Sequence, residues 1–290
     1  MIRKKNQKRR LFLRLGAGVL ALGLMLGGCG GGDRVDTAPG IAYLEEQERQ
    51  DPGVVDELLR QRRIAELEAQ RVEMLRQIKA GELDPFTVFQ DAVILGDSRA
   101  VGFFYYGYVD ESRDLTGSGD TILSIRDKLD ILEQMNPRYI YLTYGLNDIK
   151  IGHWASLESH IADYMDFVQQ IRQRVSDCVI VISSVLPFYD PAEPDPSNPS
   201  ATPKPSGSDT LTEADRRRLA KIPQWNELMK AACAENGVIF VDNSAICAEL
   251  KHMWEPDGIH VVKTFYPHWG KNLVVAALEE GGIVDENPVS

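Results

Sequence analysis

The sequence predicts an α/β protein, in which a parallel sheet of five strands carries helices on both faces. From residue 92 onward, short β-rich runs alternate with helical segments, which is the order that produces parallel sheets. The chain has 43% hydrophobic and 26% charged residues, an ordinary balance for a globular protein. Its 290 residues are enough for one sizeable domain with appendages.

The expected strands are short apolar runs, at Ala92–Leu95, Asp114–Ser118, Tyr139–Thr143, Cys178–Val185 and Val238–Val241. The expected helices lie between and after them, at Thr121–Met135, Leu157–Val175, Thr212–Glu235 and Lys263–Glu280. In a sheet with strand order 2-1-3-4-5, the segments after the first three strands are neighbours at the carboxyl edge. Such sheets bind their ligands at that edge.

The N-terminus has the features of a secretory signal peptide. Residues 1–14 contain seven basic residues and no acidic one. The apolar run that follows, Leu15–Leu26, is too short for a bilayer span, which takes about 20 residues. Leu26-Gly27-Gly28-Cys29 resembles the bacterial lipoprotein box, in which the cysteine is lipidated and becomes the mature N-terminus. We therefore expect removal of residues 1–28 and an extracytoplasmic protein anchored to the bacterial membrane by a lipid on Cys29.

Two segments connect this anchor to the domain predicted at residues 90–284. Residues 29–52 begin with a glycine run and are expected to form a flexible tether. Residues 53–89 contain a charge-rich amphipathic helix, Val54–Lys79, which Gly81 would end, and then a linker. We expect this helix to be a stalk, with packing on the domain as the alternative. A coiled coil is less well supported, because the heptads are not sustained.

The charge of the chain excludes one class of partner. Removal of residues 1–28 takes away seven of the 32 Lys and Arg residues and none of the 43 Asp and Glu residues, which leaves a net charge of −18. This negative net charge of the mature protein argues against binding to nucleic acid and against broad electrostatic adhesion to anionic polymers. The lipid, rather than charge, would hold the protein at the membrane.

Four short motifs follow the predicted strands in one order along the chain. They are Gly96-Asp97-Ser98, Gly119, Gly145-Leu146-Asn147-Asp148 and Asp257-Gly258-Ile259-His260. A serine hydroxyl needs a base within hydrogen-bond reach, and His260 is three residues from Asp257, so their side chains can meet within one turn. The N–H groups of Ser98 and Gly119 and the Asn147 amide would stabilise the oxyanion of acyl transfer. Gly117 is the alternative to Gly119.

In these motifs the chain resembles the SGNH (GDSL-type) hydrolases, over roughly residues 90–280. The resemblance identifies the four defining residues as Ser98, Gly119, Asn147 and His260, with Asp257 three residues before the histidine. It implies a flavodoxin-like domain of three layers, α/β/α, and serine esterase activity without a cofactor or a metal ion.

Three residues near the motifs are expected to contact the substrate: Arg99, Trp154 and Trp254. Arg99 stands where the resembled family usually has a leucine, which argues against a lipid substrate. For the two tryptophans, stacking on a sugar and packing in the core are the alternatives. The loop Pro187–Ser208, rich in Pro, Ser, Asp and Gly, is either a substrate-facing flap or a surface insertion.

The remaining histidines and cysteines are expected to be structural. His153, His160, His252 and His268 have no carboxylate three residues before them. Cys178, Cys233 and Cys247 lack the spacing of a zinc site or a redox pair, so buried thiols are expected. A disulfide between Cys233 and Cys247 stays open, because such bonds form outside the cytoplasm.

These observations predict an extracytoplasmic serine esterase that removes small acyl groups, acetyl above all, from carbohydrate of the cell envelope or outside it. Two alternatives are an O-acyltransferase acting on envelope polysaccharide and a non-catalytic lipoprotein that binds carbohydrate. The sequence leaves the acyl group, its carrier and the oligomeric state open.

Overall fold

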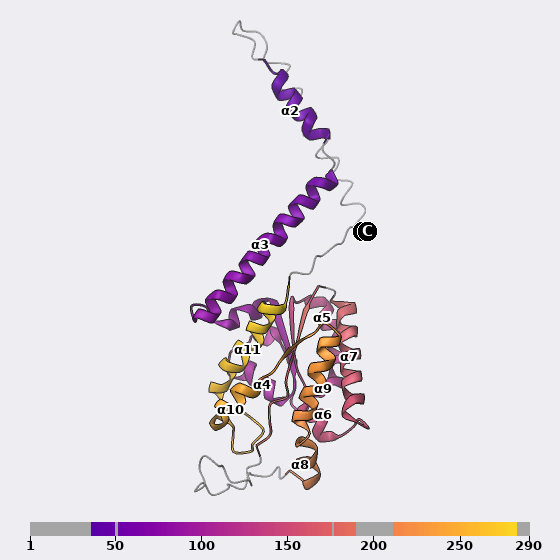
Figure 1. Ribbon diagram of the computed structural model, residues 1–290, viewed down its shortest axis with the longest axis vertical. Helices are drawn as coiled ribbons and strands as arrows, with labels where there is room; N and C mark the ends of the chain where they lie inside the picture. Colours follow the sequence, from indigo (N-terminus) through magenta and orange to yellow (C-terminus); the bar gives the residue numbers. More distant parts are fainter. Residues whose placement is uncertain (1–35, 50–51, 176, 190–210, 283–290) are drawn as a thin grey trace. The chain divides into compact units, whose positions relative to one another are not determined.

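The computed structural model of the chain describes residues 36–49, 52–175, 177–189 and 211–282 (Figure 1). The expected signal peptide and Cys29 lie outside these residues. The chain divides into two compact units, residues 1–59 and 60–290, and each is described by itself. Within the described residues, no helix combines the length and the apolarity that crossing a membrane requires.

The first unit contains a helix where the sequence predicted a flexible tether. Helix α2 (Ala38–Arg49) begins where the side chain of Asp36 accepts a hydrogen bond of 3.0 Å from the N–H of Ala38. Its later residues include Leu, Glu, Gln and Arg, which are strong helix formers. Residues 38–49 are therefore helical, and the prediction of a tether over all of 29–52 does not describe them. Helix α3 (Pro52–Ala80) begins in the same unit.

The second unit includes the C-terminal turns of α3. Ile78 is buried, and the ammonium group of Lys79 pairs with Glu279 of helix α11 (Tyr266–Glu280). This end of α3 therefore packs on the domain and is not a free stalk. The helix ends at Ala80, and Gly81, the predicted stop, follows it with a φ of +73°.

The described strands form one parallel sheet. They are β1 (Ala92–Gly96), β2 (Asp114–Thr116), β3 (Tyr139–Thr143), β4 (Val179–Ser183) and β5 (Ile239–Val241), in the order β2-β1-β3-β4-β5. This is the order in which the segments after the first three strands are neighbours at the carboxyl edge. Gly96 lies opposite Thr116 on one side and Thr143 on the other, so the carboxyl ends of β2, β1 and β3 are level.

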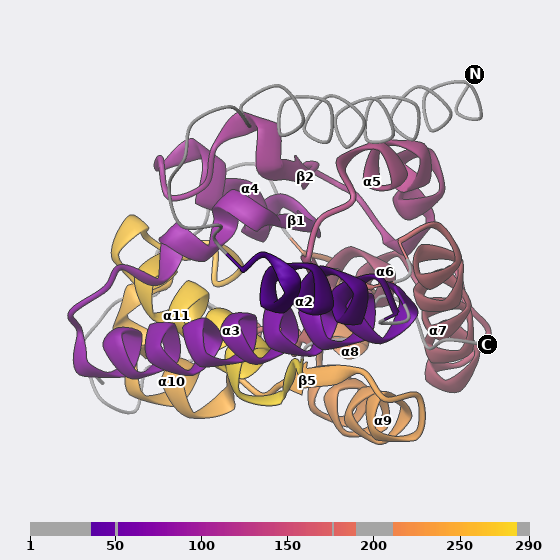
Figure 2. The same cartoon turned by 90° about the horizontal axis from the view of Figure 1, so that it is seen from above.

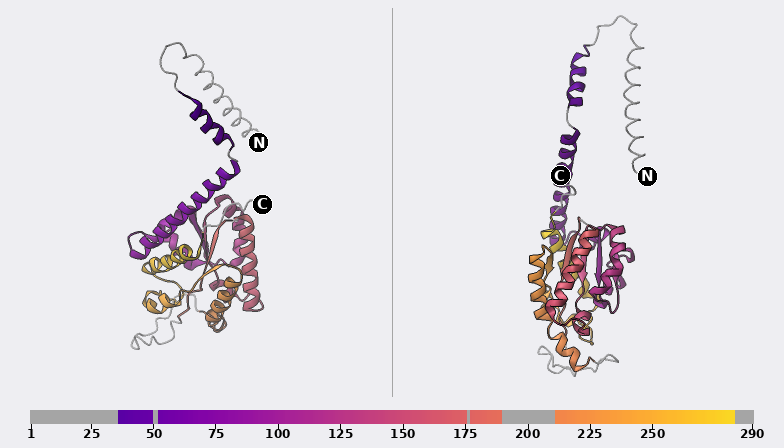
Figure 3. Two further views of the ribbon diagram at one scale, coloured as in Figure 1. Left: turned by 45° about the horizontal axis from the view of Figure 1, so that its top comes forward. Right: turned by 90° about the vertical axis from the view of Figure 1, so that its right-hand side faces the viewer.

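Helices cover both faces of this sheet, as Figures 1 and 2 show. Along each strand, side chains point alternately to the two faces of the sheet. Because β1, β3 and β4 are buried at every position, both faces of the sheet are apolar. Leu95, Leu142 and Ile182 join the core that includes residues of α5, α7 and α9. Ile94, Tyr141 and Val181 join the core that includes residues of α4, α10 and α11. The result is the three-layer α/β/α arrangement, which the views in Figure 3 also show.

The α-helices of the domain not yet given are α4 (Ser98–Tyr105), α5 (Leu129–Met135), α6 (Leu146–Ile151), α7 (Leu157–Arg174), α8 (Glu213–Leu219), α9 (Ile222–Glu235) and α10 (Ser244–Glu249). The 3₁₀ helices are η1 (Pro85–Asp91), η2 (Glu111–Arg113), η3 (Ile122–Lys128), η4 (Lys251–Met253) and η5 (Lys263–Phe265).

Three segments predicted as single helices are each made of two. Thr121–Met135 divides into η3 and α5, Thr212–Glu235 into α8 and α9, and Lys263–Glu280 into η5 and α11. In the last two cases a proline, Pro223 or Pro267, stands in the first turn of the second helix. Proline has no N–H to continue a preceding helix but fits the start of a new one.

Candidate active site

Ser98 is the first residue of α4, directly after β1. Asp97 caps the helix, since its side chain accepts a hydrogen bond of 3.0 Å from the N–H of Arg99. The Oγ atom of Ser98 lies 3.0 Å from Nε2 of His260. The serine is only partly buried, so its hydroxyl is within reach of a substrate.

A tight turn holds His260 beside the serine. Asp257 Oδ1 accepts hydrogen bonds of 2.8 Å and 2.9 Å from the N–H groups of Ile259 and His260. Asp257 Oδ2 lies 2.6 Å from His260 Nδ1. Gly258, between them, has a φ of +72°, which glycine adopts at little cost. These bonds fix the carboxylate and the imidazole as one unit.

The Asp257 carboxylate sets the proton positions on His260. Burial raises the pKa of Asp257, but hydrogen bonds from the His260 ring and from the N–H groups of His260 and Ile259 outweigh it and hold the pKa well below its ordinary value. The ionised carboxylate accepts the proton on Nδ1, which leaves Nε2 free to accept the proton of Ser98.

Two backbone N–H groups are predicted to stabilise an oxyanion, those of Ser98 and Gly119. Among the described residues, the N–H groups of Ser98 and Gly119 have no acceptor. Gly119 is exposed and has a φ of +83°. The N–H of Gly117, the alternative, is already bonded to the carbonyl of Gly96 at 3.0 Å. The geometry therefore favours Gly119 as the glycine of this site.

Asn147 lies on the first turn of α6, next to the Gly119 segment. Its Nδ2 atom donates one hydrogen bond, of 3.0 Å, to the carbonyl of Asp120, and the second amide proton remains for a substrate. Gly145, which precedes α6, has a φ of +135°, and a Cβ atom there would lie 2.3 Å from Val185. Glycine is thus required for this entry into α6.

Arg99, predicted to contact the substrate, is buried in the structure. Its side chain is buried, and its guanidinium donates to the carbonyls of Leu186 at 2.5 Å and Pro187 at 3.4 Å. Burial lowers the pKa of Arg99, and burial likewise raises the pKa of Asp97 to about 6 against the opposing charge of Arg99. The arginine is drawn inward because it can bond these carbonyls, and it holds the segment after β4 against α4.

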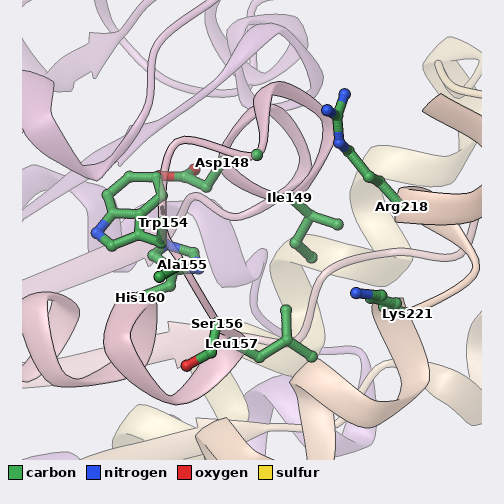
Figure 4. Close-up of a pocket in the computed structure, with 10 residues that line it drawn as sticks. Asp148, Ile149, Trp154, Ala155, Ser156, Leu157, His160, Arg218 and Lys221 are labelled. Carbon is green, nitrogen blue, oxygen red and sulfur yellow. Dashed lines mark ion pairs between the residues drawn. The ribbon is translucent and has the colours of Figure 1, made fainter. Parts of the chain in front are cut away.

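The two tryptophans differ in position. Trp254 packs edge-on against Tyr189 and Phe265, with ring centroids 4.8 Å and 5.1 Å away, and supports the turn that carries His260. Of the two alternatives for Trp254, stacking on a sugar or packing against other side chains, these contacts favour packing. Trp154 lies over His160 at 4.3 Å and lines a pocket beside α6 (Figure 4). Trp154 therefore lines a pocket whose lining does not include Ser98, His260 or Asp257.

A buried polar chain lies behind Asn147, and the sequence interpretation did not foresee it. Asp148 Oδ1 accepts the N–H of Ile122 at 2.9 Å and lies 3.3 Å from His160 Nε2. Trp225 donates its indole N–H to His160 Nδ1 at 2.9 Å. Asp148 thereby ties α6, which carries Asn147, to the start of η3 just after Gly119. The only sequence signal for it was the adjacency of Asp148 to Asn147.

Other predictions concern metals, thiols and the long loop. Within the described residues, no group of His, Cys, Asp and Glu side chains could hold a metal ion. Cys178, Cys233 and Cys247 are buried free thiols, so the open question of a Cys233–Cys247 disulfide is answered in the negative. Most of the loop Pro187–Ser208 lies outside the described residues.

A family model described as the GDSL-like lipase/acylhydrolase family matches residues 94–263, a range that contains all five predicted motif residues. A search of curated proteins gave no match.

Solved structures are similar to this chain at low identity. A GDSL-like lipase from Bacteroides thetaiotaomicron is 16% identical, with 74% of this chain and 99% of that chain covered and a TM-score of 0.45. A lipase/acylhydrolase from Enterococcus faecalis is 13% identical, covering 68% and 99%, with a TM-score of 0.42. A catalytic mutant of an acetylxylan esterase from Geobacillus stearothermophilus is 17% identical, covering 68% and 96%, with a TM-score of 0.40.

Proposed function

Since this chain belongs to the GDSL-like lipase/acylhydrolase family, we propose that it is an extracytoplasmic serine esterase that removes small acyl groups from cell-envelope or external carbohydrate. The observation that carries the catalytic part is the continuous chain of contacts from Ser98 Oγ to His260 Nε2 at 3.0 Å and from His260 Nδ1 to Asp257 Oδ2 at 2.6 Å. Nucleophile, base and orienting carboxylate stand in the order that acyl transfer requires.

In the proposed first half-reaction, Ser98 attacks the ester carbonyl and its proton moves to His260 Nε2. The carbonyl oxygen becomes an oxyanion, which accepts hydrogen bonds from the N–H groups of Ser98 and Gly119 and from Asn147 Nδ2. The ester C–O bond then breaks. The leaving sugar oxygen takes the proton from His260, and the acyl group stays on Ser98.

In the second half-reaction, water replaces the sugar. His260 accepts a proton from the water, whose oxygen attacks the acyl-enzyme, and the same oxyanion donors act again. The bond to Ser98 Oγ breaks, His260 returns the proton to that oxygen, and the free acid leaves.

The exposure of the site supports a small acyl group on a bulky carrier. The side chains of His260 and Asp257 are 42% and 38% exposed, so the triad is open to solvent. A long acyl chain gains affinity mainly by burying its methylene groups, which an open site does little to provide. An acetyl group on a sugar needs no such burial.

The activity can be tested with p-nitrophenyl acetate, butyrate and octanoate, with the Ser98→Ala variant as the control. We expect turnover to be fastest for the acetate and to fall at least about a thousand-fold in the variant. Equal rates in the two proteins would refute the assignment of Ser98. Transfer of the acyl group to an added sugar, in preference to water, would identify an acyltransferase instead.

The proposed location rests on the N-terminal sequence, with its basic start, short apolar run and Cys29. In bacteria fed a labelled fatty acid, we expect the label on the protein and the protein in the membrane fraction. The Cys29→Ser variant should lose both. Label on that variant, or none on the original protein, would contradict lipidation at Cys29.

A further inference from the structure

A pocket separate from Ser98 and His260 lies between α6, α7 and α8. Its volume is about 140 Å³, close to the roughly 150 Å³ of a cavity that holds one benzene ring, and so enough for the carboxylate and neighbouring ring atoms of a sugar. Trp154 and His160 line one side, and Arg218 and Lys221 line the other, as Figure 4 shows. Ile149 and Leu157 add apolar surface.

The two cations on this pocket are notable in a chain whose net charge is −11. Arg218 is held in place because its Nη1 donates to the carbonyl of Lys150 at the end of α6, at 3.2 Å. Lys221 Nζ has no ion-pair or hydrogen-bond partner among the described residues. Fixed guanidinium and free ammonium groups on one wall form a local positive site that attracts an anion.

Acidic groups near the cations leave this positive site largely intact. Asp215 Oδ1 lies 3.8 Å from Arg218 Nη1, longer than a hydrogen bond, and the other oxygen of this carboxylate accepts from the N–H and hydroxyl of Thr212 at 2.9 Å and 2.6 Å. Glu158, fully exposed at the start of α7, has a pKa lowered chiefly by hydrogen bonds there and only slightly by Lys221. Neither acid forms a close ion pair with Lys221.

The inner wall of the pocket is polar and has an unused acceptor. Asp148 and His160 are 1% and 2% exposed; His160 Nε2 lies 3.3 Å from Asp148 Oδ1, while Asp148 Oδ2 has no hydrogen-bond partner among the described residues. A ligand with hydroxyl groups matches such a wall, since a hydroxyl can donate to this oxygen.

The pocket and the proposed catalytic centre share helix α6. Asp148, on the inner wall of the pocket, is the residue after Asn147, an expected oxyanion donor. Helices α6 and α8 lie together at the end of the domain in Figure 1.

We propose that this pocket binds the carboxylate of an acidic sugar, and that the esterase acts on acylated polysaccharides that contain such sugars. Arg218 and Lys221 pair with the carboxylate, and the ring hydroxyls face the inner wall. A phosphate monoester fits less well, because its second charge is repelled by the Asp148 carboxylate. This inference names the substrate of the proposed esterase and rests on that function.

The test compares acetylated oligogalacturonate with acetylated xylo-oligosaccharide of the same length, one acidic and one neutral. For each substrate, kcat/KM is measured with the original protein and with the double variant Arg218→Gln/Lys221→Gln. The single variant Lys221→Gln keeps the hydrogen bond from Arg218 to Lys150 and therefore serves as the control for folding. The matched control is Arg63→Gln/Lys230→Gln, which removes two exposed charges outside the pocket. We expect the acidic-to-neutral ratio of kcat/KM to fall at least ten-fold in the pocket variant, mainly through KM, and to stay constant in the control.

The outcomes separate this inference from the proposed function. An unchanged ratio in the pocket variant, or an equal fall in the control, would overturn the carboxylate site while leaving the esterase intact. If no ester is hydrolysed in a Ser98-dependent way, the proposed function fails. In that case, calorimetry with unacetylated oligogalacturonate, on the original protein and on the pocket variant, still decides whether the pocket binds this acidic sugar. Binding of a glycerol phosphate oligomer in place of oligogalacturonate would overturn the choice of carboxylate.

Discussion

Asp257→Asn exchanges one oxygen of the carboxylate that orients His260 for an amide nitrogen. Oδ1 of the new side chain can still accept the N–H groups of Ile259 and His260, now at 2.8 Å and 2.9 Å, so the turn is retained. The amide NH₂ would then face Nδ1 across the present 2.6 Å contact. Two donors cannot pair, and the imidazole responds by moving its proton to Nε2. In that tautomer His260 cannot accept the proton of Ser98.

The size of the effect follows from how open the site is. The same exchange in the buried triad of serine proteases lowers kcat by about 10⁴. Here the Asp257 and His260 side chains are 38% and 42% exposed, so water can stabilise part of the correct tautomer. We therefore expect a loss of about 10³ in kcat, which corresponds to about 4 kcal/mol of transition-state stabilisation.

The assay is hydrolysis of p-nitrophenyl acetate at pH 8, beside urea unfolding of the same variants. Asp257→Ala makes the comparison sharper. Alanine removes the acceptor of the turn but leaves room for a water that keeps the correct tautomer. We expect Asp257→Asn to be the less active and the more stable of the two variants. A kcat within ten-fold of the original protein for Asp257→Asn would refute the assigned role of the carboxylate.

Three other substitutions test separate parts of the site. Asn147→Ala removes one oxyanion donor and should lower kcat about 10²- to 10³-fold with little change in KM, measured on the same ester; a loss below ten-fold would place the donor elsewhere. Arg99→Met leaves the carbonyls of Leu186 and Pro187 without their donor and should lower the free energy of unfolding in urea by about 2–3 kcal/mol; unchanged stability would contradict its structural role. Asp97 has a folded-state pKa of about 6, raised mainly by burial, above the unfolded value near 3.8. The folded protein thus binds the proton more tightly, and the original protein loses stability as the pH rises from about 4 to 6. Asp97→Asn, which still caps α4, should remove this loss, and parallel pH–stability curves for the two proteins would exclude it.

The fold was predictable because its strands are buried on both faces. Such strands appear in a sequence as short continuous apolar runs, and Tyr139–Thr143 was predicted with the bounds that β3 has. Interruptions inside helical segments were harder to predict, since α8 and α9 form one continuous polar-apolar pattern. Pro223 marks the break, but a proline is also tolerated at the start of a longer helix.

The environment of Arg99 was predicted wrongly for a physical reason. A charged residue next to a nucleophile is expected in solvent, where its charge costs least. Its burial depends on the carbonyls of Leu186 and Pro187, which come from a segment almost 90 residues later. No local pattern could have indicated these partners.

The sequence by itself determined which segments form strands and the residue types of the site, because both depend on local composition and on a few positions after strand ends. Ser98, Gly119, Asn147, Asp257 and His260 could each be proposed from their motifs. Only the tertiary structure decided which groups are free to act. It engages the N–H of Gly117 and leaves that of Gly119 open. It also buries Arg99 and gathers Arg218, Lys221 and His160 around a pocket that no single segment contains. Hydrogen bonds and charge pairs join atoms distant in sequence, so their arrangement becomes visible only once the chain has folded.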